Sequence, residues 1–209
     1  MIPAGFQIDL VVLVPDKQME ATIRPLLKRH ASLNIRPLTF ESLVHPRRDP
    51  GCRGDPEPLL SLYLSRAQYA LVLFDREGCG EEHLTRETLE ANVEATLTNA
   101  GWSDRSSAIV IDPELESWVW SDSVVVDQTI GWAGTQPPLR AWLKQRGFVV
   151  EGQMKPERPK EAMEAAMKHK RKRRSASIYQ ELAEKVSLAR CVDPAFLKFR
   201  AVLAQWFAA

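Results

Sequence analysis

The stretch ALVLFDREGCGEE (Ala70 to Glu82) decides how this chain can fold. Its apolar residues run without a polar interruption into Asp75, which is typical of a strand that is buried on both faces. Glu77 follows two positions later, and side chains two apart in an extended chain point the same way. The stretch therefore predicts a buried strand with two carboxylates at its carboxyl end.

Two further strands of this kind lie before and after it in the chain. IDLVVLV (Ile8 to Val14) leads to Asp16, and SSAIVI (Ser106 to Ile111) leads to Asp112. Segments with helical spacing separate the three strands, which predicts an α/β fold with a largely parallel sheet flanked by helices. The other expected elements are an exposed strand within 34–44, a Pro/Gly/Arg-rich loop over 45–58 and a long helix over 83–101.

The strand pattern stops after Ser123, and the remaining chain has helical spacing. PLRAWLKQRG (138–147) predicts a helix, GQMKPERPK (152–160) a linker, and the rest two or three helices with a break at CVDP. We therefore expect one α/β domain over residues 1–150. A basic linker and a helical C-terminal extension would follow over residues 151–209.

Composition excludes several classes of protein. The 209 residues are 44% hydrophobic, which is too apolar for a disordered chain. The net charge is only +1, but residues 75–94 hold seven acids and two bases, and residues 155–174 hold nine bases and three acids. Three scattered cysteines without a CxxC pair argue against a disulfide framework or a zinc site. The N-terminal apolar run is short and contains Asp9, so we expect no signal peptide, no membrane span and a cytoplasmic protein.

Acids follow each of the three buried strands. Because the carboxyl ends of parallel strands meet at one edge of a sheet, acids that are far apart in sequence are expected to converge there. Magnesium prefers oxygen ligands and is bound by a few carboxylates together with phosphate oxygens. The acids at these strand ends are Asp16 and Glu20, Asp75 and Glu77, and Glu114 and Glu116.

Ordinary structural roles compete with this interpretation. Asp112, followed by Pro113, has the pattern of a helix N-cap, and Glu20 could be a helix-surface acid. The acids from Glu81 onward fit the solvated start of a helix. Asp75 is harder to explain in this way, because an acid directly after a buried strand is desolvated on one side and needs a partner.

The run KHKRKRR (168–174) concentrates positive charge more than any other stretch. Such a run favours binding to the phosphate backbone of nucleic acid, although a solvated helix face or a flexible linker has the same composition. The tryptophans are expected in the core rather than as platforms for bases. The candidate nucleic-acid-binding residues are Lys168, Lys170, Arg171, Lys172, Arg173 and Arg174.

The order of these motifs resembles the Toprim family. In that family an acid follows the first strand in a motif V-E-G-x-x-D/E, and a D-x-D pair follows a later strand. LVPDKQMEATIRPLL (13–27) matches the first motif, with Asp16 in place of the catalytic glutamate, Lys17 in place of the glycine and Glu20 as the trailing acid. LVLFDREG (71–78) matches the second, with Asp75 and Glu77 in place of the two aspartates.

A closer likeness is to the Toprim-like proteins of prokaryotic defence loci, the RloB-like and OLD-like groups. Some of these carry an E-x-E-x-W-type segment after the next strand, which PELESWVWSD (113–122) matches, and a C-terminal helical pattern like ASIYQELAEKVSLARC (176–191). The resemblance implies a magnesium site, with manganese as a substitute. It implies catalytic roles for Asp16 and Glu20 and metal binding by Asp75, Glu77, Glu114 and Glu116.

The resemblance implies a component of a prokaryotic antiviral defence system that cleaves phosphodiester bonds of nucleic acid and works with other defence proteins. Asp16 is one methylene shorter than the family's glutamate, and Lys17 replaces a glycine. These departures favour an alternative, a catalytically inactive subunit that binds nucleic acid or a partner protein. A small-molecule phosphotransferase is less well supported, because the sequence has no Gly-rich phosphate loop.

Overall fold

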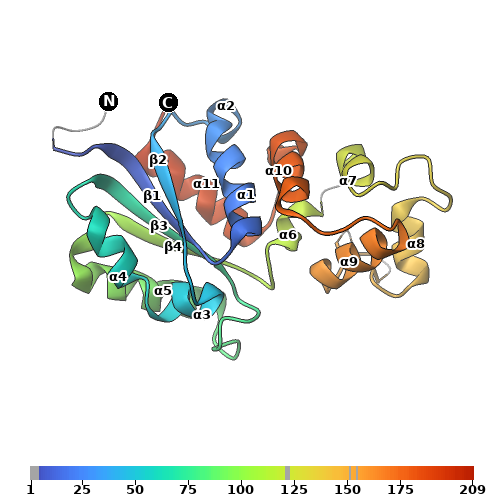
Figure 1. Cartoon of the computed structure of the whole chain (residues 1–209), viewed down its shortest axis with the longest axis horizontal. Coiled ribbons are helices and arrows are strands. Elements are labelled where there is room, and N and C mark those ends of the chain that lie inside the picture. Colours follow the sequence, from blue (N-terminus) through green and yellow to red (C-terminus); the bar gives the residue numbers. More distant parts are fainter. Residues whose placement is uncertain (1–4, 121–122, 151, 154) are drawn as a thin grey trace.

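A sheet of four parallel strands organises the molecule, in the order β2-β1-β3-β4 (Figure 1). The computed structural model describes residues 5–120, 123–150, 152–153 and 155–209. The predicted α/β fold with a parallel sheet is confirmed, and the two most apolar strands are the central ones. The strands are β1 (Ile8–Val14), β2 (Phe40–Val44), β3 (Ala67–Asp75) and β4 (Ser106–Ile111).

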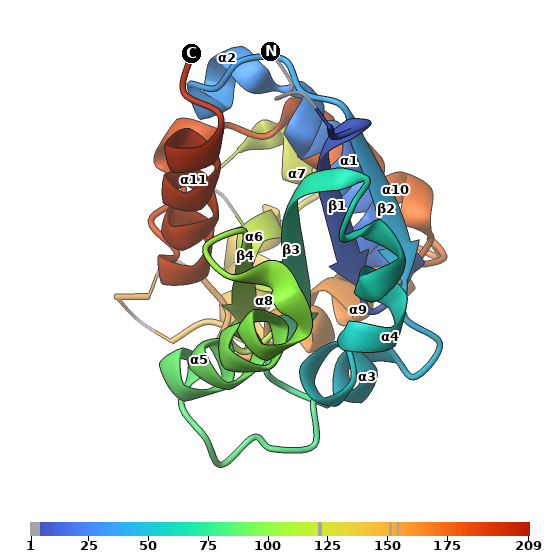
Figure 2. The ribbon, with the colours of Figure 1, turned by 90° about the vertical axis from the view of Figure 1, so that its left-hand side faces the viewer.

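Successive residues of the central strands pack under different layers of helices, because a strand points its side chains alternately to its two faces. Val12 and Leu73 belong to the core under α1, α10 and α11, whereas Leu13 and Val72 belong to the core over α3 and α5. Figure 2 shows these layers on opposite sides of the sheet. Their helices are α1 (Lys17–Lys28), α3 (Arg48–Gly54), α5 (Arg86–Leu97), α10 (Ala176–Lys185) and α11 (Pro194–Trp206).

After β4 the chain leaves the sheet, builds a lobe beyond it and then returns (Figure 1). On the return, α10 packs against α1, and α11 packs against β4. The predicted C-terminal helices are therefore present, and two of them complete one layer over the sheet. The division at residue 150 stays a prediction. The helices from β4 to α10 are α6 (Glu116–Val119), α7 (Val124–Thr129), α8 (Leu139–Gln145) and α9 (Pro159–His169).

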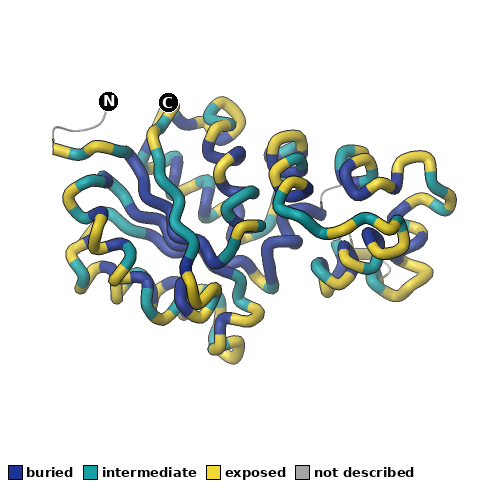
Figure 3. Tube along the Cα trace, viewed as in Figure 1, coloured by how far each residue is buried: buried dark blue, intermediate teal, exposed yellow. Residues whose placement is uncertain are grey.

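Burial follows this arrangement. The central strands are buried along almost their whole length, and the helices bury only the sides that face the sheet or one another (Figure 3). Trp118, Trp120, Trp132 and Trp142 are buried, as expected for core residues, and Trp206 is half-buried. No helix among the described residues is long and apolar enough to cross a membrane.

The chain around the start of α5 is exposed at Glu82 and Glu87, as predicted for the acids from Glu81 onward, but two acids farther along the helix are structural. Glu90 accepts a hydrogen bond from the backbone N–H of Val110 (3.0 Å), and Glu94 accepts one from Ala108 (2.9 Å). Lys198 of α11 pairs with both carboxylates. The exposed edge of β4 is thus covered by side chains, which satisfies amides that would otherwise lack partners.

Residues 45–58 form helices where the sequence predicted a loop. They contain α3 and the start of α4 (Glu57–Leu60), which a 3₁₀ turn over Ser61–Tyr63 continues. The long helix expected over 83–101 begins at Arg86 and ends in a wide turn over Thr98–Trp102. Proline and glycine favour turns in a local pattern, but the stretch 45–58 contains both residues and still forms short helices.

The N-cap prediction for Asp112 is wrong. Asp112 pairs with Arg76 (3.3 Å), and the next helix, α6, begins only at Glu116. The backbone N–H of Leu115, just before that helix, donates instead to Asp75 from the neighbouring strand (2.9 Å). An acid from another strand has therefore taken the role that the local pattern gave to Asp112. The last two residues of the segment PELESWVWSD (113–122), Ser121 and Asp122, lie outside the described residues.

The position of α3 depends on His45, which is buried at the end of β2. Its Nδ1 accepts a hydrogen bond from the backbone of Arg47 (3.0 Å), so the neutral ring carries its proton on Nε2, which donates to the carbonyl of Asp55 (3.1 Å). The ring lies against Gly51, where a Cβ atom would stand 1.9 Å from Nδ1.

Gly51→Ala should therefore destabilise the protein by about 1–3 kcal/mol, the cost of overpacking a filled site, as measured by urea unfolding. Gly54→Ala in the same helix is the control, because its Cβ would meet nothing within 4 Å. Equal stability of the two variants would show that the ring of His45 can move without cost.

Candidate functional site

Five carboxylates stand at the carboxyl ends of the strands, and we call them the acidic edge. Asp16 follows β1, Asp75 ends β3, and Glu114 and Glu116 follow β4. Asp49 lies in the first turn of α3, shortly after β2. The parallel register produces this grouping, because it sets the last residues of neighbouring strands side by side: Val14 lies opposite Val44, and Asp75 lies opposite Ile111.

Asp75 is fixed by backbone hydrogen bonds on both sides. Its Oδ1 accepts from the N–H of Leu115 (2.9 Å), which ties it to the segment after β4. Its own backbone N–H donates to Oδ1 of Asp49 (2.9 Å), which ties it to α3. Asp75 is thus the point where three segments of the chain meet.

The acidic edge concentrates negative charge that is only partly neutralised. Burial raises the pKa of Asp75 well above its usual range, and the charges of Asp49, Glu116, Glu114 and Asp16 raise it further. The pKa of Asp49 is also raised, mainly by burial. Such a cluster is electrostatically costly unless a proton or a cation is shared among the carboxylates.

Asp16 also serves as the N-cap of α1. Its Oδ1 accepts hydrogen bonds from the backbone N–H groups of Gln18 and Met19, both at 2.9 Å. This is a common role for an aspartate before a helix, and it orients the carboxylate at the end of β1. Asp16, Asp49 and Asp75 are all partly buried, whereas Glu114 and Glu116 are fully buried.

Glu114 and Glu116 are buried and paired with cations from the C-terminal half of the chain. Glu114 accepts from the backbone N–H of Lys160 (2.9 Å) and pairs with its ammonium group (3.3 Å). Glu116 pairs with Arg174 (2.8 Å) and accepts a hydrogen bond from the hydroxyl of Tyr179. These contacts attach α9 and α10 to the acidic edge.

The other two acids predicted for the site lie at its margin. Glu20 pairs with Lys17 (2.6 Å) and accepts from Ser42 (2.8 Å); burial raises its pKa, but these two partners outweigh that effect and lower it. Glu77 is exposed in the turn after β3, and its charge is among those that raise the pKa of Glu114.

Sequence reasoning missed Asp49, because HPRRDPGC was interpreted as a loop without a function. One signal was available. Every other strand end carries an acid within a few residues, and Asp49 stands in the same relation to β2. Its contact with the backbone of Asp75 could not be predicted, because it depends on how α3 folds back over the sheet.

Magnesium, which the motif resemblance implies, fits this donor set in chemistry and charge. Asp16, Asp49 and Asp75 offer only oxygen atoms, and the repulsion among the carboxylates is what a divalent cation would relieve. Among the described residues, no three histidine, cysteine, aspartate or glutamate side chains are already gathered as metal ligands. Binding would therefore require side-chain movement at the acidic edge.

Half of the cations of the basic run make contacts inside the protein, and the binding of nucleic acid by the run stays a prediction. Lys170 donates to Thr135 (3.0 Å) and lies over the ring of Trp132. Lys172 donates to the carbonyl of Thr129. Arg174, besides pairing with Glu116, pairs with Glu164 (3.1 Å). The exposed cations of the run are Lys168, Arg171 and Arg173.

Compared with models of protein families, with curated proteins and with solved structures, the chain matches none of them. The function is therefore inferred from the acidic edge and from the resemblance of the sequence motifs.

Asp75→Asn should raise the melting temperature at neutral pH by a few degrees. The native pKa of Asp75 lies above its unfolded value, so its contribution to stability falls as pH rises through the native pKa. Asparagine removes the charge and keeps an oxygen to accept from Leu115. The gain should shrink as pH is lowered toward 4, because the wild-type carboxyl is then protonated too.

Asp104→Asn is the matched control for this experiment. Asp104 is exposed and has a positive φ, a conformation that asparagine adopts readily. The Asp104→Asn variant should have the same melting temperature as the wild type at every pH. A melting temperature of Asp75→Asn below that of the wild type at neutral pH, with the difference disappearing as pH falls toward 4, would mean that the charged carboxylate stabilises the fold.

Proposed function

We propose that this protein is a Toprim-like component of a prokaryotic antiviral defence system, with magnesium-dependent phosphodiester-cleaving activity on nucleic acid. The observation that carries the proposal is the gathering of four further carboxylates around Asp75 from separate segments of the chain, at the carboxyl ends of the parallel strands. Burial, together with the charges of these four groups, raises the pKa of Asp75 well above its usual range. Perturbed carboxylates that cluster at the carboxyl ends of parallel strands are typical of a functional site.

The roles of the residues follow from their access to solvent. Asp16, Asp49 and Asp75 would hold the metal, because they are only partly buried. Magnesium, when bound, stabilises the negative charge that builds up on phosphate oxygens. Asp16 would accept the proton of the attacking water. Glu114 and Glu116 would position the edge through Lys160 and Arg174 rather than ligate the ion.

The exposed cations Lys168, Arg171 and Arg173 would bind the nucleic-acid backbone. Lys168 lies in the last turn of α9, and Arg171 and Arg173 follow this helix, whose first turn contacts Glu114 of the acidic edge. Each neutralised phosphate releases counterions, so these contacts supply affinity without reading the sequence. Their place in the lobe beyond the strand ends would hold a bound strand on the side of the acidic edge (Figure 1).

A second candidate function is a non-catalytic subunit that binds nucleic acid or another defence protein. It is favoured by the internal use of the acids: Asp16 caps a helix, Asp75 accepts a backbone N–H, and Glu116 is ion-paired. In that case the acidic edge is a structural centre, and the exposed basic residues alone carry the function.

Two measurements distinguish the two candidate functions: the effect of metal ions on the melting temperature, and the cleavage of nucleic acid. Magnesium or manganese should raise the melting temperature of the wild type, because an ion that binds only the folded state stabilises it. Asp49→Asn and Asp75→Asn should lose this response, together with metal-dependent cleavage of single-stranded and duplex DNA and RNA. Asp104→Asn should keep both. A wild type that responds to neither ion and cleaves none of these substrates would leave the binding subunit as the function.

Nucleic-acid affinity should depend on the three exposed cations. Replacing Lys168, Arg171 and Arg173 with glutamine should flatten the log–log salt dependence of duplex DNA binding by roughly 3 units, at about 0.9 per phosphate. Arg174 is kept, because its loss would leave Glu116 buried without a counter-charge.

The control variant removes the same charge elsewhere, at Lys28, Arg66 and Lys185, which lie at the ends of α1 and α10 and next to the start of β3. It should keep the salt dependence of the wild type. Equal effects of the two triple variants would mean that net charge, and not the basic run, drives binding.

A further inference from the structure

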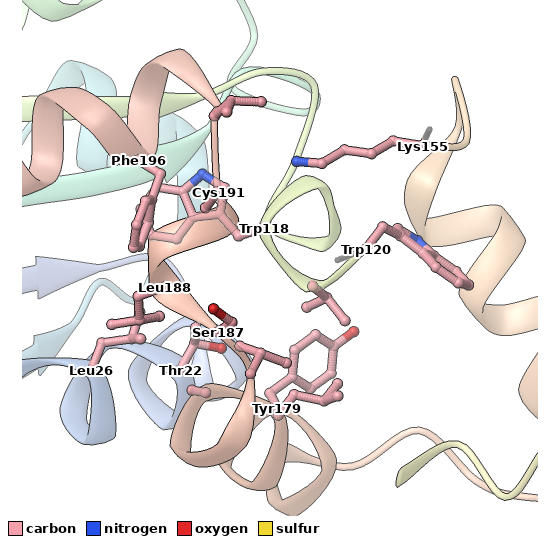
Figure 4. A pocket seen from close by; sticks show the side chains of 15 residues that line it. Thr22, Leu26, Trp118, Trp120, Lys155, Tyr179, Ser187, Leu188, Cys191 and Phe196 are labelled. Atoms are coloured by element: carbon pink, nitrogen blue, oxygen red, sulfur yellow. The ribbon is translucent and has the colours of Figure 1, made fainter. Parts of the chain in front are cut away.

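A cavity of about 410 Å³ opens between α1, α6, α10 and the segment that leads into α11 (Figure 4). Its walls come from segments that are far apart in sequence, so only the folded chain forms it. None of the five carboxylates of the acidic edge lines it. The cavity is therefore separate from the proposed metal site, although α6 contributes to both.

The walls are mainly apolar and strongly aromatic. Figure 4 shows Trp118, Tyr179 and Phe196 around the space, with Leu26 and Leu188 near them. The polar atoms of two of these rings are already used. The indole N–H of Trp118 donates to Asp193 (3.0 Å), and the hydroxyl of Tyr179 donates to Glu116. These rings thus offer the cavity flat apolar surface without an unmet hydrogen bond.

Lys155 is the one charged residue among the described residues that line the cavity. Its ammonium group donates one hydrogen bond to the carbonyl of Ser117 (2.6 Å), which leaves two of its three N–H donors for another acceptor. Its side chain extends over α6 toward Trp118 (Figure 4). Burial raises the pKa of the Cys191 thiol, so this residue stays neutral and adds no charge to the cavity at neutral pH.

The volume sets the size of an occupant. About 410 Å³ equals the liquid volume of roughly 14 waters at about 30 Å³ each, and lies within the range of small-molecule pockets. Water gains few hydrogen bonds from aromatic and aliphatic walls, whereas a flat apolar molecule gains contact with them. The cavity therefore suits one compact ring system rather than a long chain.

We propose that this cavity binds a small organic monoanion, with an aromatic body among Trp118, Tyr179 and Phe196 and one carboxylate on the ammonium group of Lys155. A carboxylate is the complementary group, because a single cation among apolar walls is best matched by a single negative charge with oxygen acceptors. The proposal does not depend on metal binding or on nucleic-acid cleavage.

The test uses 2-naphthoate and its neutral analogue 2-naphthamide as probes of the full-length protein. Titration calorimetry should show one saturable site for 2-naphthoate, and tryptophan fluorescence should change with the same midpoint, because Trp118 and Trp120 line the cavity. The amide should bind on the order of tenfold more weakly, since it lacks the charge-assisted hydrogen bond to Lys155.

Two variants separate the charge from the cavity. Lys155→Met should weaken the binding of 2-naphthoate on the order of tenfold and leave the affinity for 2-naphthamide unchanged. A general loss of folding would weaken the binding of both probes. Ala183→Phe should fill the space and weaken both probes, because Ala183 is buried and lines the cavity. Ala201→Phe places the same ring on an exposed position of α11 and should bind both probes like the wild type.

Three results would overturn the proposal. The first is that 2-naphthoate shows no saturable binding at millimolar concentration. The second is that the wild type binds both probes with equal affinity. The third is that a folded Ala183→Phe variant binds the probes as the wild type does. A cavity that accepts only a side chain of a partner protein would give the first of these. Circular dichroism and melting curves establish that each variant is folded before its affinity is compared.

Discussion

Asp75 holds its carboxylate among four others at the end of a strand whose preceding residues are completely buried. A strand cannot shift in register without moving all its side chains to the wrong faces, so the register of β3 fixes the backbone position of Asp75 at the acidic edge. The surrounding chain supplies the hydrogen-bond partners of Asp75. Asp49 accepts a hydrogen bond from the backbone N–H of Asp75, and the backbone N–H of Leu115, in the segment after β4, donates to the carboxylate of Asp75. These two bonds tie α3 and the residue before α6 to the end of β3.

The remaining charge of the acidic edge determines how the C-terminal half attaches. Glu114 and Glu116 are buried, and a buried carboxylate without a counter-charge is strongly destabilising. Lys160 and Arg174 supply that charge from either end of the α9 segment, and Tyr179 adds a hydroxyl donor from α10. The basic composition of residues 155–174 therefore has a structural cause as well as a proposed role in binding nucleic acid.

The short helix α6 connects two regions of different chemistry. Its first residue, Glu116, belongs to the acidic edge, and Trp118, Val119 and the following Trp120 line the apolar cavity. Tyr179 also belongs to both, because its ring lines the cavity while its hydroxyl donates to Glu116. One turn of helix thus carries a buried ion pair and an aromatic wall, which explains why two acids are followed by two tryptophans in this segment.

The sequence alone determined the three buried strands, the parallel sheet and the acids at the strand ends, because these follow from runs of apolar residues and from where the runs stop. Only the tertiary structure decided which acids meet. It added Asp49 by folding α3 over the sheet, gave Asp75 the amide that local pattern assigned to Asp112, and turned Arg174 inward to Glu116. The spacing of residues along the sequence does not predict these contacts, because each contact joins residues from different segments that only the packing of the layers brings together.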